Sequence, residues 1–387
     1  MPLDFALLAT TGRARRGRLR LPHGVVETPA FMPVGTLGAV KGLGPEELEA
    51  AGAEIQLANL YHLSVRPGID VIERLGGLHA FTGWRRPHLT DSGGFQVMSL
   101  AGLRRIDDQG VTFRSHLDGD LLRFTPAQVV RDQRRLGVDI AMALDECPPW
   151  PAERRAVEEA VRRTGMWARQ AREAWPGGPG ALFGIVQGGV HEDLRRRSLG
   201  ELVGLEFDGY AIGGVSVGEP GPERRRVVDW VAPELPAGKP RYLMGVGTPA
   251  DLAQAVLRGV DLFDCVLPSR NARHGVAYAR EGVLRLKNSR FRDDGGPLDP
   301  DCRCAACRRV SRAFLHHLVR AGELSAAVLL TQHNLRFYLD FMADLRKAIE
   351  SGSIADLAPE IDRRFGEAGP SEESTAGSRS AATQPFP

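Results

Sequence analysis

Asp139-Ile-Ala-Met-Ala-Leu-Asp145 and Leu182-Phe-Gly-Ile-Val-Gln187 are two apolar runs that flank Pro151–Trp175, a segment with helical character. An apolar run, a helix and a second apolar run in this order indicate two parallel strands joined by a crossover helix. Six more such runs occur along the chain: Phe31–Val34, Glu54–Asn59, His88–Asp91, Tyr210–Gly214, Arg241–Val246 and Leu262–Cys265. Eight units of this kind predict a (β/α)8 barrel, or TIM barrel, of the α/β class.

The ends of these runs carry residues suited to chemistry. Active sites of (β/α)8 barrels form at the carboxyl ends of the strands. Four polar residues, a glycine and a methionine stand at or near six of these ends: Asp91, Asp145, Gln187, Gly214, Met244 and Asp264. Two more segments with helical character, Pro126–Gly137 and Pro249–Gly259, fit the same alternation. We therefore expect a single site on the C-terminal face of the barrel.

Length and composition are those of an ordinary globular enzyme. The chain has 387 residues, of which 43% are hydrophobic and 25% charged. That length holds one barrel of roughly 250 residues and an appendage. No apolar stretch approaches the roughly 18 residues that a membrane-spanning helix needs. Met1–Thr11 lacks the basic start and apolar centre of a signal peptide. We expect a cytoplasmic protein without a membrane segment.

Positive charge is unevenly distributed, although the net charge is only +2. Residues 270–312 contain 11 Lys or Arg against 5 Asp or Glu. A second basic cluster lies near the start and comprises Arg13, Arg15, Arg16, Arg18 and Arg20. Such clusters are typical either of a solvated charged face or of a surface that contacts nucleic-acid phosphates. The charge pattern alone leaves both alternatives open.

Three of the five cysteines are crowded into Cys302-Arg-Cys304-Ala-Ala-Cys307. Five cysteines in a chain of intracellular character argue against a disulfide framework. A closed set of three cysteines and one histidine is a common tetrahedral ligand set for structural zinc. His333 is the favoured fourth ligand, because we expect it to open a helix from which it reaches back. His316 and His317 are the alternatives. We predict one structural Zn2+ per chain.

Four regions follow from these patterns. They are an N-terminal closure of the barrel by strands and turns at 1–28, the catalytic barrel at 29–274, a hairpin with the zinc-binding subdomain and C-terminal helices at 275–350, and an extension at 351–387. Gly12–Gly17 is predicted as a hairpin loop, and the alternating pattern of Gly275–Lys287 predicts a second hairpin. Helices are expected near Ser311–Arg320 and His333–Glu350. From about residue 366 the composition predicts a disordered tail.

Two carboxylates at strand ends suggest chemistry at a sugar carbon. Asp91 lies in Thr90-Asp-Ser-Gly-Gly94, which taken alone is also a common turn sequence. Asp264 stands inside the apolar stretch Leu262–Pro268, where a charge is costly to bury without a task. Two carboxylates on opposite sides of an anomeric carbon can act as a nucleophile and a proton carrier. Asp145 is expected to bind a polar ligand edge, with a helix cap as the alternative.

Glycines concentrate at two further strand ends, Gly184–Gly189 and Ala211–Glu219. Glycine at these positions allows the backbone to approach a flat ligand closely. Neither stretch matches a phosphate-binding loop or a dinucleotide fingerprint, so we predict no nucleotide cofactor.

Together these stretches closely resemble the tRNA-guanine transglycosylases, also called queuine tRNA-ribosyltransferases. The resemblance runs in order over about residues 3–350. It rests on the zinc cluster and on Thr90–Ser99, Leu144–Cys147, Gly184–Gly188, Ile212–Gly214, Met244–Gly247 and Phe263–Pro268. The family is a zinc-containing barrel that exchanges guanine at the tRNA wobble position for a 7-deazaguanine base.

The resemblance implies a role for each matching residue. Asp264 would be the nucleophile that forms a covalent bond to the ribose, and Asp91 the general acid/base. The guanine edge would be bound by Ser92, Asp145, Gln187, Gly213 and Gly214, and the ring would lie between Phe95 and Met244. Arg270 and Arg273 would approach the anticodon loop. Cys302, Cys304, Cys307 and His333 would bind the zinc.

Val217 and Cys147 resemble the bacterial type, whose substrate is 7-aminomethyl-7-deazaguanine, whereas Val215-Ser216 departs from the Leu-Ala common in bacterial relatives. The family also implies a homodimer. Two other functions remain as alternatives: a glycoside hydrolase that uses water as the acceptor, and a non-catalytic RNA-binding subunit.

Overall fold

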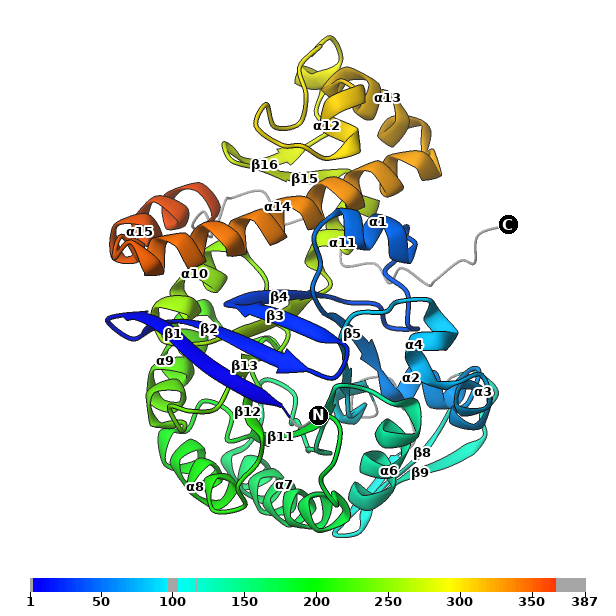
Figure 1. Cartoon of the computed structure of the whole chain (residues 1–387), viewed down its shortest axis with the longest axis vertical. Helices are drawn as coiled ribbons and strands as arrows, with labels where there is room; N and C mark the ends of the chain where they lie inside the picture. The colour runs from blue at the N-terminus through cyan, green and yellow to red at the C-terminus, as the bar shows by residue number, and fades with distance from the viewer. Residues whose placement is uncertain (1–2, 97–103, 116, 367–387) are drawn as a thin grey trace.

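The computed structural model describes residues 3–96, 104–115 and 117–366, and its centre is an eight-stranded parallel barrel (Figure 1). In spatial order the strands are β4 (Ala30–Pro33), β5 (Gln56–Asn59), β6 (His88–Asp91), β10 (Ile140–Met142), β11 (Ala181–Val186), β12 (Gly209–Ile212), β13 (Arg241–Leu243) and β14 (Leu262–Cys265). β14 pairs with β4, and a bridge from Val34 to Leu57 brings β4 beside β5. The predicted (β/α)8 barrel is therefore confirmed.

Each predicted apolar run overlaps one of these strands, and β4, β11 and β12 each begin one residue before the run. His88–Asp91 and Leu262–Cys265 match β6 and β14 residue for residue. The runs that were predicted to end on Asp145, Gln187, Gly214 and Val246 extend too far, because these residues and Met244 lie in the loops that follow β10, β11, β12 and β13. The parallel pairing of the strands stops before these residues, so they belong to loops at the C-terminal face of the barrel.

A three-stranded antiparallel sheet closes the other end of the barrel. It consists of β1 (Asp4–Thr11), β2 (Ala14–Leu21) and β3 (Gly24–Thr28). Leu19, Leu21 and Val26 pack in one buried cluster with the residues that fill the barrel interior. The predicted loop Gly12–Gly17 is too long, because β2 already pairs with β1 from Ala14 onward and only Gly12 and Arg13 form the turn.

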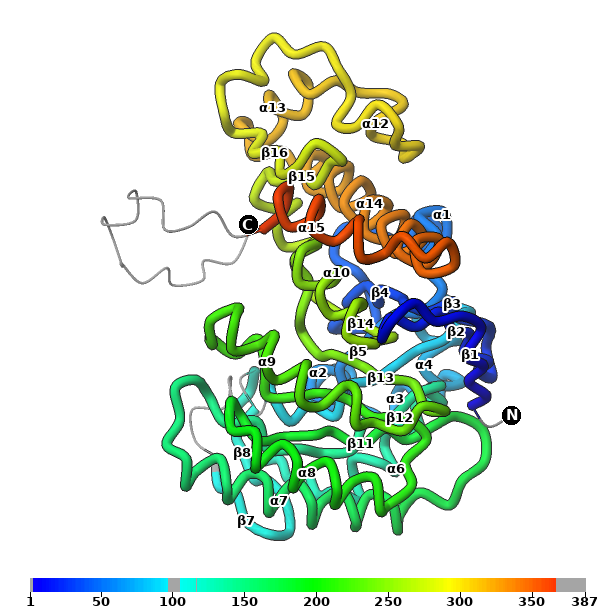
Figure 2. The backbone as a smooth tube through the Cα atoms, turned by 90° about the vertical axis from the view of Figure 1, so that its left-hand side faces the viewer, coloured from blue at the N-terminus to red at the C-terminus, as the bar shows by residue number. Residues whose placement is uncertain are grey.

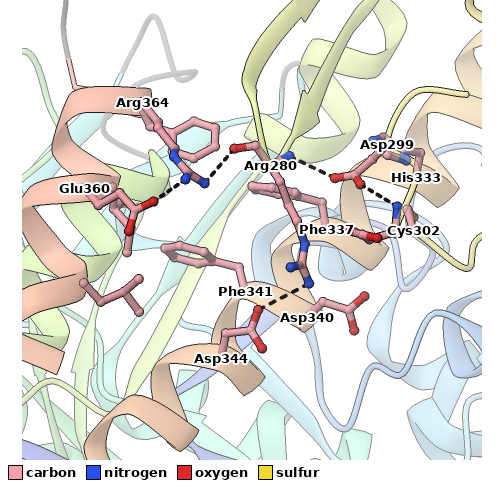
Figure 3. A pocket seen from close by; sticks show the side chains of 14 residues that line it. Arg280, Asp299, Cys302, His333, Phe337, Asp340, Phe341, Asp344, Glu360 and Arg364 are labelled. Atoms are coloured by element: carbon pink, nitrogen blue, oxygen red, sulfur yellow. Dashed lines mark hydrogen bonds and ion pairs between the residues drawn. The ribbon is translucent and has the colours of Figure 1, made fainter. Parts of the chain in front are cut away.

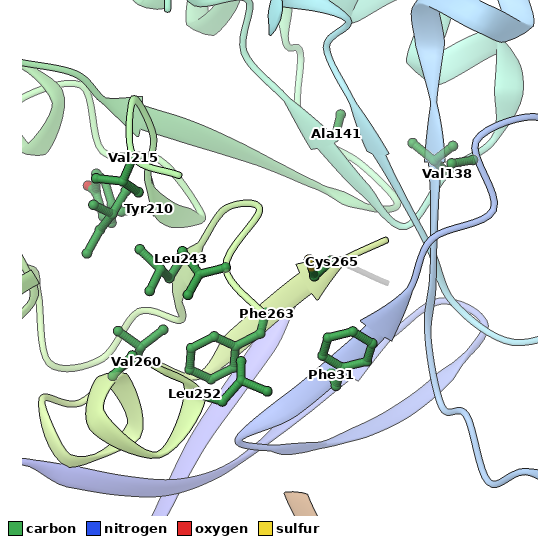
Figure 4. Packing of buried hydrophobic residues seen from close by; sticks show 14 of the residues in the cluster. Phe31, Val138, Ala141, Tyr210, Val215, Leu243, Leu252, Val260, Phe263 and Cys265 are labelled. Carbon is green, nitrogen blue, oxygen red and sulfur yellow. The ribbon is translucent and has the colours of Figure 1, made fainter. Parts of the chain in front are cut away.

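Helices surround the barrel and bury its outer face. They are α1 (Pro45–Ala50), α2 (Leu60–Val65), α3 (Ile69–Arg74), α4 (Gly77–Thr82), α6 (Pro126–Leu136), α7 (Arg154–Ala174), α8 (Glu192–Val203), α9 (Gly221–Val231) with the short 3-10 turn η1 (Ala232–Glu234), α10 (Pro249–Leu257) and α11 (Leu267–Arg273). Phe31 and Phe263 on the strands pack with Leu252 on α10 (Figure 4). The helices predicted around Pro126, Pro151 and Pro249 correspond to α6, α7 and α10.

An additional antiparallel sheet lies between β6 and α6. Its strands are β7 (Arg104–Asp107), β8 (Gly110–Arg114) and β9 (Leu121–Phe124). The sequence analysis did not predict it, although Asp107–Gly110 is a turn sequence between two alternating stretches. Val111, Phe113 and Phe124 join the buried core, so this sheet packs as a cover on the barrel.

The C-terminal part stands on one side of the barrel, and its long helix α14 packs against the barrel (Figures 1 and 2). It contains the hairpin β15 (Val276–Ala279) and β16 (Gly282–Arg285), the turn η2 (Ser289–Phe291), and the helices α12 (Ala305–Arg309), α13 (Arg312–Ala321), α14 (Leu324–Glu350) and α15 (Ile354–Phe365). The predicted hairpin is confirmed.

The predicted start of the last long helix at His333 is wrong. α14 begins at Leu324, because the preceding residues are good helix formers and two of them, Ala326 and Leu330, are buried. Beyond α15, the predicted tail lies outside the described residues except for Gly366. Among the helices that the structure describes, none combines the length and the apolar character needed to cross a membrane.

Candidate active site

A cavity of about 230 Å³ opens at the carboxyl ends of the barrel strands. Seven of the nine residues predicted for catalysis or base binding line it: Asp91, Phe95, Asp145, Gly213, Gly214, Met244 and Asp264. The other two, Ser92 and Gln187, are fully buried and contact Asp145. The barrel thus brings together residues that are far apart in the sequence.

Asp264 is the last polar residue of β14. Its Oδ1 accepts two hydrogen bonds of 2.7 Å, one from the Tyr242 hydroxyl and one from the Gly245 backbone N–H. Burial raises the pKa of Asp264, although both bonds favour the carboxylate. No hydrogen bond to Oδ2 is found within the described residues. The carboxyl group is therefore held by one oxygen while the other is left without a protein partner.

Asp91 ends β6 and faces the same cavity. Its Oδ2 accepts a hydrogen bond from Asn59 Nδ2 at 2.8 Å, and its Oδ1 accepts one from the Gly93 N–H at 2.8 Å. Asn59 lies opposite Asp91 in the β5–β6 pairing, so the sheet register itself places this bond. Burial, with the negative charge of Asp264 adding to it, raises the pKa of Asp91 to about 6. That value suits a group that exchanges a proton near neutral pH.

Asp145 lies in the loop after β10 and is almost completely buried. Its Oδ2 accepts a bond of 2.7 Å from Gln187 Nε2, and Ser92 Oγ lies 3.5 Å from its Oδ1. Burial and the charge of Asp91 raise the pKa of Asp145 to about 7. Gln187 Oε1 is buried without a hydrogen-bond partner among the described residues. A buried acceptor of this kind points to a ligand that completes it.

The glycines at the end of β12 are required by the packing around them. A Cβ at Gly214 would contact Gln187 Oε1, and one at Gly213 would meet the Ile185 side chain at 2.5 Å. Gly214 also has a φ of 60°, which glycine adopts without strain. Phe95 and Met244 add apolar surface to the cavity wall. The cavity therefore combines acidic groups, backbone edges and apolar surfaces, as a flat polar ring requires.

Sequence reasoning missed several residues of this site. Asn59 and Tyr242 hold the two acids, and Glu219 accepts hydrogen bonds from the N–H groups of Ser216 and Val217. Asn59 carried a usable signal, because it ends its apolar run just as Asp91 does. Tyr242 lies inside an apolar run, where nothing in the sequence distinguishes it from a core residue.

The predicted zinc ligands come together around His333, in the N-terminal half of α14. The three thiols of Cys302, Cys304 and Cys307 and a ring nitrogen of His333 all lie within 4.8 Å of one another. His333 Nδ1 is 3.2 Å from the Cys307 sulfur and 3.6 Å from the Cys304 sulfur. All five cysteines are free of disulfides, as predicted. This cluster can hold a metal ion.

His333 is oriented for that task. Its Nε2 donates to the Tyr278 carbonyl at 2.7 Å, which leaves Nδ1 facing the thiols, the usual arrangement of a metal-binding histidine. Hydrogen bonds from Cys302 and Cys307 lower the pKa of the Cys304 thiol, so the crowded sulfurs favour a thiolate at this position. The alternative ligand His316 binds the Leu286 carbonyl through Nδ1 at 2.6 Å, and His317 is exposed outside the cluster.

A second cavity, of about 180 Å³, lies beside the metal-binding cluster between α14, α15 and the β15–β16 hairpin (Figure 3). Two ion contacts lie along it: Arg364 contacts Glu360, and Arg280 lies 3.8 Å from Asp344. None of the nine residues predicted for catalysis or base binding lines this second cavity. The cavity at the strand ends is therefore the candidate active site.

The two basic regions differ. Arg270 and Arg273 are exposed on α11, directly after the strand that carries Asp264. In the N-terminal cluster, Arg15 pairs with the buried Asp261 at 3.2 Å, and both Arg16 and Arg18 contact Glu27. These three arginines are engaged with acids of the protein, which disfavours the phosphate-contacting alternative for the N-terminal cluster.

An eight-stranded barrel with two acids on one cavity at its C-terminal face has the arrangement of enzymes that carry out displacement at a sugar carbon.

The profile of the family described as "Queuine tRNA-ribosyltransferase" matches residues 10–367. Proteins named queuine tRNA-ribosyltransferase from Nitrosomonas eutropha and Azotobacter vinelandii are each 54% identical to this chain, over 356 and 364 residues. These matches cover 92% and 94% of this chain and 99% and 98% of the relatives. A protein of the same name from Nitrosospira multiformis is 55% identical over 358 residues, which are 92% of this chain and 98% of that relative. The chain belongs to the queuine tRNA-ribosyltransferase family.

Proposed function

We propose that this protein exchanges the guanine at the wobble position of tRNA for 7-aminomethyl-7-deazaguanine. One observation carries the proposal: Asp91 and Asp264 line a single cavity, and each is held by neutral hydrogen-bond donors that leave its charge available. Family membership supplies the class of the reaction, a ribosyl transfer.

Asp264 would act as the nucleophile. Its carboxylate forms a bond to ribose C1′ while the bond from C1′ to guanine N9 breaks, and the electron pair leaves with the base. The bonds from Tyr242 and Gly245 to Oδ1 fix the attacking group without neutralising it by a cation. The product is a covalent ester between the enzyme and the RNA, which divides one difficult displacement into two.

Asp91 would carry the protons. It protonates the departing guanine and then removes the N9 proton of the incoming base, whose N9 attacks C1′ and displaces Asp264. A pKa of about 6 places Asp91 between its two protonation states near neutral pH. Because two displacements occur at C1′, the configuration there is retained.

The base would lie between Phe95 and Met244, with its polar edge toward Asp145 and the Gly213–Gly214 backbone. Ser92 and Gln187 contact Asp145, and the unpaired Gln187 Oε1 offers one more acceptor. Cys147 and Val217 line the cavity as well, and Val217 limits the room for a larger queuine side chain. The target nucleotide must be turned out of its stack, as single-stranded RNA loops allow.

The surroundings of the site fit a tRNA substrate. Arg270 and Arg273 stand on α11 next to the cavity and would contact phosphates of the anticodon loop. We further propose that the protein works as a homodimer in the cytoplasm, where its tRNA substrate is found.

We propose that the metal of the Cys302, Cys304, Cys307 and His333 cluster is zinc, because three thiolates and one imidazole are its usual closed ligand set. When bound, it would hold α12 and α14 together and supply no catalytic step. Cys304→Ser should lower the zinc content and the melting temperature together. An unchanged melting temperature after removal of the metal by a chelator would argue against this role.

A base-exchange assay tests the main proposal. The protein is incubated with tRNA and labelled guanine, 7-aminomethyl-7-deazaguanine or queuine, and incorporation into the RNA is measured. We expect incorporation of the first two bases and little of queuine. Release of guanine that leaves an abasic site in the tRNA, without incorporation of the added base, would instead support a hydrolase. Binding of tRNA without either reaction would support the non-catalytic RNA-binding alternative.

A further inference from the structure

Arg195 on α8 is a fully buried charged side chain whose guanidinium group binds backbone carbonyls instead of a carboxylate. Its Nε donates to the Gly189 carbonyl at 2.8 Å, and its Nη1 donates to those of Val186 at 2.8 Å and Gly213 at 2.7 Å. Its Nη2 donates to the Gly214 carbonyl at 3.1 Å. The four carbonyls belong to the end of β11 and to the loops that follow the neighbouring strands β11 and β12. These loops border the candidate active site.

Burying this guanidinium costs desolvation free energy, so we expect the side chain to have a specific role. Burial lowers the pKa of Arg195 to about 10, which still leaves the group charged at neutral pH. In the part of the chain that the structure describes, no acidic group forms an ion pair with it. An apolar side chain would fill the same space at a smaller desolvation cost. The four hydrogen bonds therefore indicate that these loop carbonyls have to be held in place.

Holding the Gly213 carbonyl also orients the amide that follows it. The peptide unit is planar and trans, so the Gly214 N–H points away from the Gly213 carbonyl. Because Arg195 binds that carbonyl, the N–H is directed away from Arg195. The Gly214 carbonyl is bound as well, which fixes the next peptide unit. Gly213 and Gly214 both line the cavity, whereas Arg195 does not.

A second side chain of α8 fixes the neighbouring strand end. Ser198 Oγ accepts a hydrogen bond of 3.1 Å from the Gln187 N–H, and Gln187 in turn binds Asp145 at 2.7 Å. Arg195 and Ser198 are three residues apart, so they lie on the same face of the helix. One helix face thus holds both loops that would contact the base.

We propose that α8, mainly through Arg195 with support from Ser198, positions the Gly214 N–H to donate to the 6-oxygen of a guanine or 7-deazaguanine base. The inference rests on the proposed function, because that function supplies the base. Arg195 contacts neither the base nor the ribose, so it is a positioning residue.

The test is Arg195→Lys, which keeps the positive charge but loses the planar arrangement of guanidinium N–H donors. The matched control is Arg197→Lys, an exposed position of the same helix that pairs with Glu201. Affinities for guanine, for 2-aminopurine, which lacks the 6-oxygen, and for tRNA are measured by calorimetry. We expect Arg195→Lys to bind guanine about tenfold more weakly, the effect of one hydrogen bond. Binding of 2-aminopurine and tRNA should be unchanged, and the control should resemble the wild type.

Unchanged guanine affinity, or equal losses for guanine and 2-aminopurine, would overturn the inference. If Arg195→Lys does not fold, Ser198→Ala takes its place: a loss for guanine without a loss for 2-aminopurine, at an unchanged melting temperature, supports the inference, and unchanged guanine binding or equal losses overturn it. Base exchange by the wild type is measured in parallel. A wild type that does not exchange contradicts the proposed function, whereas exchange with an unaffected Arg195→Lys contradicts only the positioning role.

Discussion

The two ends of the barrel carry the same acidic residue in opposite surroundings. At the carboxyl ends of the strands, Asp91, Asp145 and Asp264 accept hydrogen bonds from neutral groups, and none of them forms an ion pair within the described residues. At the amino ends, Asp139 contacts His23 at 3.0 Å and His79 at 3.1 Å, and Asp261 contacts Arg15 at 3.2 Å.

The difference appears in the pKa of Asp145 and Asp139. Burial and the charge of Asp91 raise the pKa of Asp145 to about 7. Burial acts in the same direction on Asp139, but bonds from the His79 ring and the His88 N–H outweigh it and lower its pKa. Asp261 does not follow this contrast, because burial raises its pKa to about 6 although Arg15 pairs with it.

Carboxylates held by neutral donors and carboxylates held by imidazole or guanidinium groups therefore have different roles. A carboxylate held by hydroxyl and amide groups is not neutralised by a protein cation and stays open to a substrate, and its burial is a cost to stability. A carboxylate that accepts bonds from imidazole or guanidinium groups connects chain segments and is unavailable to a ligand. This division fits the general placement of catalysis and stability at the two faces of such barrels.

The largest effect is expected from Asp264→Asn. The amide keeps an oxygen for the Tyr242 and Gly245 donors but is not a nucleophile. We expect base exchange to fall by at least about 10³-fold, with no covalent RNA adduct on denaturing gels and tRNA binding retained. The melting temperature should not fall. An adduct that survives in this variant would overturn the nucleophile assignment.

Asp91→Asn should come next, with a loss of about 10²- to 10⁴-fold in base exchange, the usual contribution of a general acid or base. In the wild type, the incoming base must lose its proton to ionised Asp91. Release of guanine needs the protonated form instead, so the second step is measured by itself, starting from the covalent enzyme–RNA intermediate. The rate of this step should rise with pH through a value near 6. A pH–rate profile of the step checks the prediction, and a flat profile between pH 5 and pH 7 would contradict it.

Asp139→Asn should affect stability instead of chemistry. An amide cannot accept all the bonds of Asp139, so the free energy of unfolding should fall by about 2–4 kcal/mol at pH 7. Exchange per folded molecule should be unchanged. Because the folded pKa lies below the ordinary value of 3.8, the contribution of Asp139 is complete well above that value and is lost as the pH falls through the folded pKa. Urea unfolding at several pH values measures this, and an equal loss at every pH would contradict it.

Asp145→Asn should show the opposite pH dependence. The folded pKa of about 7 lies above the ordinary value of 3.8, so the ionised form costs stability above pH 7 and the cost disappears toward pH 4. Gln187 can turn its unpaired Oε1 toward the new amide. The melting temperature should rise by a few degrees at pH 8 and by less at pH 5. A lower melting temperature at pH 8 would show that the charge stabilises this end too.

The smallest effect is expected from Arg18→Gln. Arg18 is partly exposed, and Glu27 keeps its contact with Arg16. Stability should change by less than about 1 kcal/mol. The salt dependence of tRNA binding should stay the same, since the cluster is engaged within the protein. A clearly weaker dependence of tRNA affinity on salt concentration in this variant would support a phosphate-binding role for the N-terminal arginines.

Several features were accessible from the sequence because they depend on local pattern. Eight apolar runs separated by helical segments are enough to predict the barrel, and β6 and β14 were placed residue for residue. The cysteine spacing identified the metal-binding cluster. Two boundaries, the start of α14 and the turn before β2, were wrong, because neighbouring residues there are equally suited to either state. The β7–β8–β9 sheet was not predicted at all.

The sequence by itself determined the barrel and most of the residues that line its cavity, since hydrophobic periodicity and polar strand ends are local properties. Only the tertiary structure decided what each aspartate contacts. Asp91 meets Asn59, Asp264 meets Tyr242, and Asp139 meets two histidines through pairings between distant segments. Whether a buried acid is reactive or structural depends on those partners, and partners are fixed only when the strands close into a barrel.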